Sequence, residues 1–196
     1  MCSRLDKQLE FLVEVDKMKS VLRQTLLADG SKRENDAEHS WHFALMAMVL
    51  YEYADQTKVN LYRVIKMALI HDLVEVYAGD TFAYDDKGNA DKEMREGEVA
   101  QKLFSLLPED QHQEIRNLWI EFDQMVTGDA KYAAAIDRLQ PFINNYLTQG
   151  HTWKLGNVTS DKVYKRMDMV RTAAPTLWPF VCETIDKAIE KGYLNA

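Results

Sequence analysis

The sequence predicts an all-α protein that forms a single domain over residues 1–196. Eight Gly and four Pro are few for this length, and 46% of the residues are hydrophobic, which is enough for one sizeable core. Apolar residues also recur at helical spacing along most of the chain. These three observations favour a compact helical body over a sheet protein.

The first two helices are predicted on either side of a polar turn at residues 28–31. Leucines recur on one side of residues 5–27, which indicates one long helix. The second helix follows Asn35, because this side chain can cap the next amides while Glu38 bonds back to it. Its apolar face continues to Leu50.

A third amphipathic helix is expected over residues 60–77, and Gly79 suits the left-handed turn that ends many helices. Residues 81–90 are polar and turn-rich, so we predict a mobile surface loop that could serve as a lid.

Four further helices are predicted over about residues 91–107, 109–125, 160–173 and 175–191. Between the second and third of these, a helix capped by Asp129 is expected to kink or break near Pro141, because proline cannot donate to the carbonyl of Asp137.

Two predicted core-facing stripes carry charged residues. The stripe of the third helix ends in His71, Asp72 and Glu75, and Asp137 interrupts the stripe of the helix after Asp129. An unpaired carboxylate taken out of water costs several kcal/mol, so these groups require a cation. His39, in the first turns of the second helix, can complete the set.

His39, His71, Asp72 and Asp137 together offer two imidazoles and two carboxylates. This mixed donor set suits one divalent transition ion such as Mn, Fe, Co, Ni or Zn, with room for water or substrate. Taken singly, each residue has a simpler interpretation. Either histidine could be a hydrogen-bonded core residue, and Asp137 could form a salt bridge with Arg138.

Composition and charge exclude several functions. A net charge of −7 disfavours non-specific binding to duplex nucleic acid, although a small phosphorylated substrate remains compatible with this charge. No apolar run approaches the roughly 20 residues needed to cross a membrane, and no secretion signal is evident. Two cysteines outside any CxxC pair indicate a reducing compartment, so we expect a cytoplasmic protein.

The order His39, His71-Asp72, Asp137 resembles the H…HD…D pattern of the HD-domain metal-dependent phosphohydrolases. The segments ENDAEHS at residues 34–40 and HDLVEVYAGD at residues 71–80 are similar to those of the 5′-deoxynucleotidase (YfbR-like) branch. The resemblance implies a single-domain HD-domain helical bundle with these four residues as ligands. Its metal-site core would span about residues 20–140, with helices at about 160–192 as scaffold.

The resemblance also implies roles in proton transfer for Glu75 and Asp80. Glu75 lies three residues after Asp72 on the predicted helix, so its carboxylate could reach a metal-bound water. The alternative is that Glu75 only holds a metal ligand in place. No added histidines beyond His112 lie between Asp72 and Asp137, which favours a single metal.

For substrate binding, the resemblance implies that Arg23 holds the 5′-phosphate from the first helix, with Arg33 as a second candidate. Surface solvation is the alternative for Arg33. Gln24 stands where the family has a tryptophan that is implicated in rejecting the ribose 2′-hydroxyl. We therefore expect Gln24 to affect sugar selectivity and to allow weaker discrimination between deoxyribose and ribose.

The predicted function is a phosphohydrolase that removes the 5′-phosphate from nucleoside monophosphates, in a protein that the resemblance implies is a homodimer. Two alternatives stay open. The same chemistry could act on another phosphorylated metabolite, or the metal could staple helices in a non-catalytic binding module. Intact Glu75 and Asp80 argue against a purely structural site, since stapling requires neither.

Overall fold

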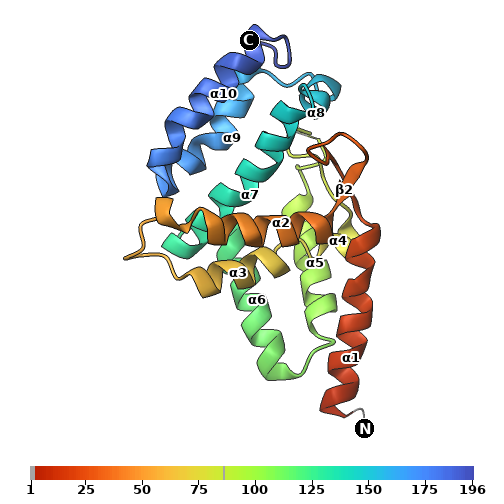
Figure 1. Ribbon diagram of the computed structural model, residues 1–196. Helices are drawn as coiled ribbons and strands as arrows, with labels where there is room; N and C mark the ends of the chain where they lie inside the picture. Colours follow the sequence, from red (N-terminus) through yellow and green to blue (C-terminus); the bar gives the residue numbers. More distant parts are fainter. Residues whose placement is uncertain (1–2, 86) are drawn as a thin grey trace.

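A computed structural model describes residues 3–85 and 87–196 and confirms the predicted all-α class. Figure 1 shows three helices in the middle of the molecule, with the other helices above and below them. The central helices, which pack against one another, are α2 (Asp36–Val49), α3 (Leu61–Ile70) and α7 (Gly128–Leu147).

The larger core lies between the central helices and the C-terminal helices α9 (Ser160–Ala173) and α10 (Trp178–Glu190). The short helix α8 (His151–Leu155), which we did not predict, joins α7 to this group. Fully buried apolar residues from each helix meet here, among them Phe43, Met67, Ile136, Val163 and Ile185. Their burial is the main force holding the C-terminal helices against α7.

A smaller core lies on the opposite side, where α1 (Arg4–Val15), α5 (Lys92–Phe104) and α6 (Glu109–Gln124) gather (Figure 1). Phe11 and Phe104 are buried in it together with Val74, which precedes the short helix α4 (Glu75–Ala78). The segment that carries His71 and Asp72 therefore lies between the two cores. Within the described residues, no helix is long and apolar enough to span a membrane.

The prediction of one helix over residues 5–27 was wrong. Helix α1 ends at Val15, a 3₁₀ turn (η1, Asp16–Ser20) follows, and strand β1 (Leu22–Leu26) then pairs antiparallel with β2 (Arg33–Asn35). The polar turn that we expected to end the helix closes this hairpin instead. Gly30 has φ of +71°, a conformation that glycine adopts at little cost and that hairpin turns require.

The third predicted helix, residues 60–77, is interrupted. Helix α3 ends at Ile70, and α4 begins only at Glu75. The intervening turn is tightened by bonds between residues three apart, such as Glu75 N to the carbonyl of Asp72 at 2.9 Å. Trp119 Nε1 donates to the carbonyl of His71 at 3.1 Å, so a tertiary contact holds this turn in place.

One of the predicted helix ends is confirmed. Asn35 and Glu38 form the predicted capping box at the start of α2, with Asn35 Oδ1 accepting from Glu38 N at 2.9 Å. Gly79 follows α4 with a positive φ of +73°, but its ψ of 155° differs from the left-handed helical turn that we predicted. Residues 81–85 and 87–90 contain no helix or strand, as expected for a loop, and their action as a lid stays a prediction.

Asp129 does not cap α7. The cap is Thr127, whose hydroxyl accepts from Ala130 N at 3.1 Å, because the helix begins two residues earlier than predicted. Asp129 instead accepts hydrogen bonds from Asn60 N at 2.6 Å and from Arg63 Nε at 2.8 Å, which joins α7 to the start of α3. The helix also continues through Pro141 without the break that we predicted as one possibility.

Candidate metal centre

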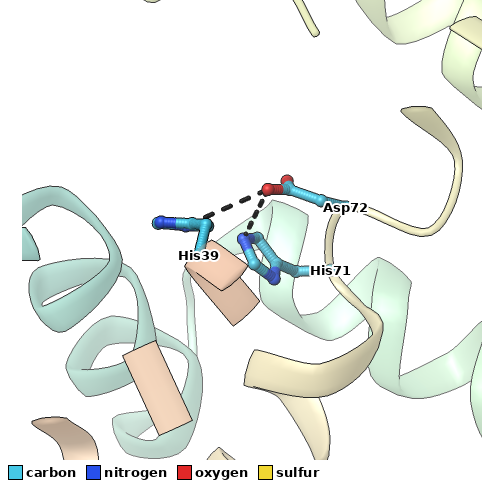
Figure 2. A group of neighbouring side chains, drawn as sticks. All are labelled: His39, His71 and Asp72. Carbon is cyan, nitrogen blue, oxygen red and sulfur yellow. Dashed lines mark ion pairs between the residues drawn. The ribbon is translucent and has the colours of Figure 1, made fainter. Parts of the chain in front are cut away.

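The four predicted ligands come together from three separate segments. His39 projects from α2, His71 and Asp72 from the turn after α3, and Asp137 from α7. His39 Nε2 lies 3.0 Å from Asp137 Oδ1, and His71 Nε2 lies 3.0 Å from Asp72 Oδ2. Figure 2 shows Asp72 between both imidazoles, with its Oδ2 also 3.9 Å from His39 Nε2.

Both imidazoles are oriented by hydrogen bonds on their far nitrogen. His71 Nδ1 donates to the carbonyl of Ala68 at 3.0 Å, and His39 Nδ1 lies 3.0 Å from Gln140 Oε1, which can only accept. This pattern leaves the Nε2 lone pair of each ring facing Asp72 and Asp137. Metal-ligating histidines are held in the same way in other proteins.

The four residues fit a divalent transition ion. His71 Nε2 is buried and has no hydrogen-bond partner in the described residues, so it is an unused donor atom at the centre of the group. Burial alone would lower the pKa of His71, yet Asp72 and Asp137 raise it to about 10. The two carboxylates therefore stabilise a positive charge at the position where a metal would sit, as an N- and O-donor site requires.

The simpler interpretation of Asp137 is not supported. Arg138 donates to the carbonyl of Arg166 at 3.3 Å and to Met125 Sδ at 3.1 Å, and among the described residues Asp137 forms ion pairs only with His39 and His71. Asp137 therefore faces the metal centre and is not half of a salt bridge with its neighbour.

A second group of acids lies next to the metal centre. Carboxylate oxygens of Glu75 and Asp80 come within 4.8 Å of each other and of Asp36, which the sequence analysis did not select. Asp36 is fully buried, and neither of its oxygens has a hydrogen-bond partner among the described residues. Burial and the charge of Asp72 raise the pKa of Asp36 to about 7 and raise that of Glu75 as well. Asp36 can therefore hold or release a proton near neutral pH.

Arg23 lies between the two groups of acids. Its Nη1 is 2.7 Å from Asp72 Oδ2 and 3.6 Å from Asp36 Oδ1, and its Nε is 3.8 Å from Glu34 Oε2. Burial alone would lower the pKa of Arg23, but the surrounding carboxylates, Asp72 foremost, raise it. Arg23 reaches this position from strand β1 and not from a first helix as predicted.

The other two predicted substrate residues are placed differently. Gln24 is exposed on β1 and lines the same cavity as Arg23 and Asp72. Arg33 lies on β2 and donates to the carbonyls of Arg23 and Leu22, so its guanidinium holds the hairpin together. Arg33 is not among the residues that line the cavity.

The cavity beside the metal centre also contains residues that the sequence analysis missed. Lys92 enters from the start of α5, and Tyr84 enters from the loop before it. Arg166 comes from the C-terminal helices at about residues 160–192 that we predicted to be scaffold, and Trp153 comes from α8, which we did not predict. Gln140 had a detectable signal, because it lies three residues after Asp137 on the same predicted stripe.

Comparisons with known proteins agree with this geometry. A sequence profile described as HD domain matches residues 15–178. The chain is 31% identical over 133 residues to the human protein named 5′-deoxynucleotidase HDDC2 and 32% identical over 133 residues to its mouse counterpart. These alignments cover 67% of this chain but only 63% and 65% of the two relatives, so the chain spans less than two thirds of their length.

A solved structure resembles almost the whole chain. It is the crystal structure of a predicted metal-dependent phosphohydrolase from Magnetospirillum magnetotacticum, with 50% sequence identity and a TM-score of 0.94. The match covers 99% of this chain and 97% of that one. The helical arrangement around the metal centre is therefore shared by the two proteins.

Proposed function

Because the chain belongs to the HD-domain family, we propose that it is a phosphoric monoester hydrolase that removes the 5′-phosphate from nucleoside and deoxynucleoside monophosphates. One observation carries the proposal. Arg23 lies between a four-residue N- and O-donor centre and buried acids whose pKa values are raised. One cavity is bordered by Arg23, by three residues of the donor centre (His71, Asp72 and Asp137) and by the acids Glu75 and Asp80. A site that only stapled helices would need neither the arginine nor the acids.

His39, His71, Asp72 and Asp137 would hold one divalent ion, such as Mn, Co, Fe, Ni or Zn. When bound, such an ion polarises a phosphoryl oxygen and lowers the pKa of a water molecule. A metal content of one per chain, lost in Asp72→Ala and retained in the exposed α6 control Asp123→Ala, would support this assignment. Two ions per chain, or unchanged binding in Asp72→Ala, would contradict it.

Glu75 and Asp80 would divide the proton transfers of the reaction. Both carboxyls have raised pKa values, caused first by burial, so one can take a proton from the attacking water while the other protonates the leaving alkoxide. We assign the first role to Glu75, which lies closer along the chain to the metal ligands. Asp80, at the start of the loop, would approach the leaving group.

Arg23 would bind the substrate phosphate, with its ion pair to Asp72 linking phosphate and metal. A charge-assisted hydrogen bond contributes about 1.5–3 kcal/mol. Arg23→Ala should therefore lower kcat/KM roughly 10- to 150-fold for every monophosphate, whatever its base. Arg171→Ala is the matched control, since Arg171 is exposed, pairs with Asp168 and is not among the residues that line the cavity.

Gln24 would influence recognition of the sugar. An amide can accept from or donate to a ribose 2′-hydroxyl, so we expect weak discrimination between deoxy and ribo forms of one nucleotide. Gln24→Trp should increase the preference for the deoxy form. A strict deoxy preference in the unmodified protein would show that Gln24 is not the residue that contacts the sugar.

The test of the activity is a screen for released inorganic phosphate. Matched deoxy and ribo monophosphates of each base are incubated with metal-free protein, with Mn²⁺ and with Co²⁺, and sugar phosphates serve as the alternative substrate class. Release from nucleotides only with metal supports the proposal. Release from sugar phosphates alone would reassign the substrate, and metal binding without any release would favour a non-catalytic module.

We also propose that the enzyme is a homodimer in the cytoplasm. Helix α2 has no charged residue from His39 to Val49, yet Trp41, Leu45 and Met48 are 64%, 41% and 52% exposed. A surface helix that is apolar on its outer face normally packs against another protein surface. The exposed leucines of α1 lie among lysines and glutamates, so α2 is the more suitable face for a second copy.

A further inference from the structure

Besides Arg23, two arginines that lie close to each other line the cavity beside the metal centre. Arg138 follows the ligand Asp137 on α7, and Arg166 lies on α9. Both line the same cavity as Asp72 and Asp137. Arg138 donates to the carbonyl of Arg166 at 3.3 Å, so the two residues are neighbours in space although 28 positions apart in sequence.

Neither of these two guanidinium groups forms an ion pair with a carboxylate of the described residues. Among residues 3–85 and 87–196, the guanidinium of Arg138 donates only to the carbonyl of Arg166 and to the sulfur of Met125, both uncharged acceptors. Other partly buried arginines are compensated, as Arg23 is by Asp72 at 2.7 Å and Arg63 by Asp129 at 2.8 Å. Burial lowers the pKa of Arg138, and the charge of Arg166 lowers it further.

The walls around the pair are aromatic. Tyr84 reaches the cavity from the loop before α5, and Trp153 and Phe142 line the same cavity. Burial raises the pKa of Tyr84, and the charges of Arg166 and Arg138 oppose that rise, which places the hydroxyl near both guanidinium groups. Trp153 and Phe142 are buried, so a planar base could lie only against the half-buried ring of Tyr84 while the arginines bind a neighbouring group.

We propose that Arg138 and Arg166 form an anion-binding subsite for a second phosphoryl group of a nucleotide whose 5′-phosphate lies at the metal centre. The inference rests on the proposed function, because it assumes that the substrate is a nucleotide. The neutral oxygens of a base would accept hydrogen bonds but would leave two adjacent positive charges uncompensated. A phosphoryl group accepts in the bidentate geometry that arginine offers and also neutralises the pair.

Binding, measured without turnover, tests this subsite. Calorimetric titrations use the metal-loaded Glu75→Gln variant of the full chain, in which hydrolysis is expected to be slow, and compare deoxyadenosine 5′-monophosphate with its 5′-diphosphate and 3′,5′-bisphosphate. We expect at least one of the two doubly phosphorylated nucleotides to bind about 10-fold more tightly than the monophosphate or better. A gain for the diphosphate places the subsite along the phosphate chain, and a gain for the bisphosphate places it beside the sugar.

Three variants locate the effect. Arg166→Gln and Arg138→Gln should each reduce the preference for a second phosphoryl group to about 2-fold or less. Arg171→Gln should leave it unchanged, because Arg171 lies on the same helix, is exposed, and already pairs with Asp168. Circular dichroism confirms folding, and two independent variants keep the test valid if one is unstable.

Two results would overturn the subsite. One is equal binding of all three nucleotides, and the other is a preference that survives both Arg166→Gln and Arg138→Gln. Because these titrations involve no catalysis, a protein that hydrolysed no nucleotide could still show the preference. An active enzyme could equally fail to show it, so the subsite and the proposed activity can be refuted separately.

Discussion

Gln140 holds the metal centre in place without contacting a metal, and its replacement by leucine is an informative perturbation. The side chain is fully buried on α7. Its Oε1 accepts from His39 Nδ1 at 3.0 Å, and its Nε2 donates to Glu34 Oε1 at 2.7 Å. Gln140→Leu keeps most of the volume but removes both bonds, so His39 loses its orientation and Glu34 loses its donor.

The size of the effect follows from these two bonds. A buried polar group left without its partner costs about 1–3 kcal/mol, so two such groups should lower the free energy of unfolding by about 2–6 kcal/mol. For a chain of this length, that corresponds to a fall in Tm of roughly 4–24 °C. Loss of a residue that orients a metal ligand lowers metal affinity about 10- to 100-fold.

Metal affinity is measured by calorimetric titration of chelator-stripped protein with Mn²⁺ or Co²⁺, and Tm by differential scanning calorimetry. Gln124→Leu is the control, because Gln124 is exposed at the end of α6 and remote from the centre in its contacts. We expect Gln140→Leu to remain folded with weakened metal binding and Gln124→Leu to match the parent. A metal Kd for Gln140→Leu within 2-fold of the parent would refute the argument that Gln140 orients His39.

Three further predictions follow from the site and its surface. Glu75→Gln should retain the metal and lose roughly 100-fold in kcat, as removal of a general acid or base does; loss of the metal would make Glu75 a ligand. The metal-free protein should be less stable at about pH 8 than at about pH 5.5, judged by Tm. Burial raises the pKa of Glu34 and that of Asp36 to about 7, so the folded state keeps protons that the unfolded chain releases near pH 4, and this stabilisation is lost as the pH rises through 7. His71, with its pKa raised to about 10, acts in the same direction, and a Tm that rises from pH 5.5 to 8 would contradict the assignment. Trp41→Glu should convert a dimer into a monomer in light scattering, and a dimer that persists would exclude the α2 face.

Local sequence was sufficient for the features that depend on neighbours along the chain. The capping box of Asn35 and Glu38 and the positive φ of Gly79 after α4 are both decided by backbone geometry within a few residues. The helical class followed from apolar periodicity in the same way. The candidate metal ligands could be selected because acids on an apolar stripe have no simple reason to be there.

Long-range packing decided the rest. His39 and Asp137 are 98 positions apart and meet only because α2 packs against α7, which periodicity cannot show. The residues around Arg23 form a hairpin and not the predicted helix, because pairing with β2 satisfies the backbone hydrogen-bonding groups of β1.

Long-range packing also placed near the metal centre side chains that no sequence pattern indicated. Nothing in the sequence indicated a role for Asp36, because acids are common at helix N-termini. Only its burial beside Glu75 and Asp80 makes it unusual. The sequence analysis did not select Arg166, and only the packing of α9 on α7 places it beside Arg138. The sequence by itself therefore determined the helical class and indicated the four candidate metal ligands. Tertiary packing decided which cations and acids surround them, because charge compensation depends on distance in space and not on distance along the chain.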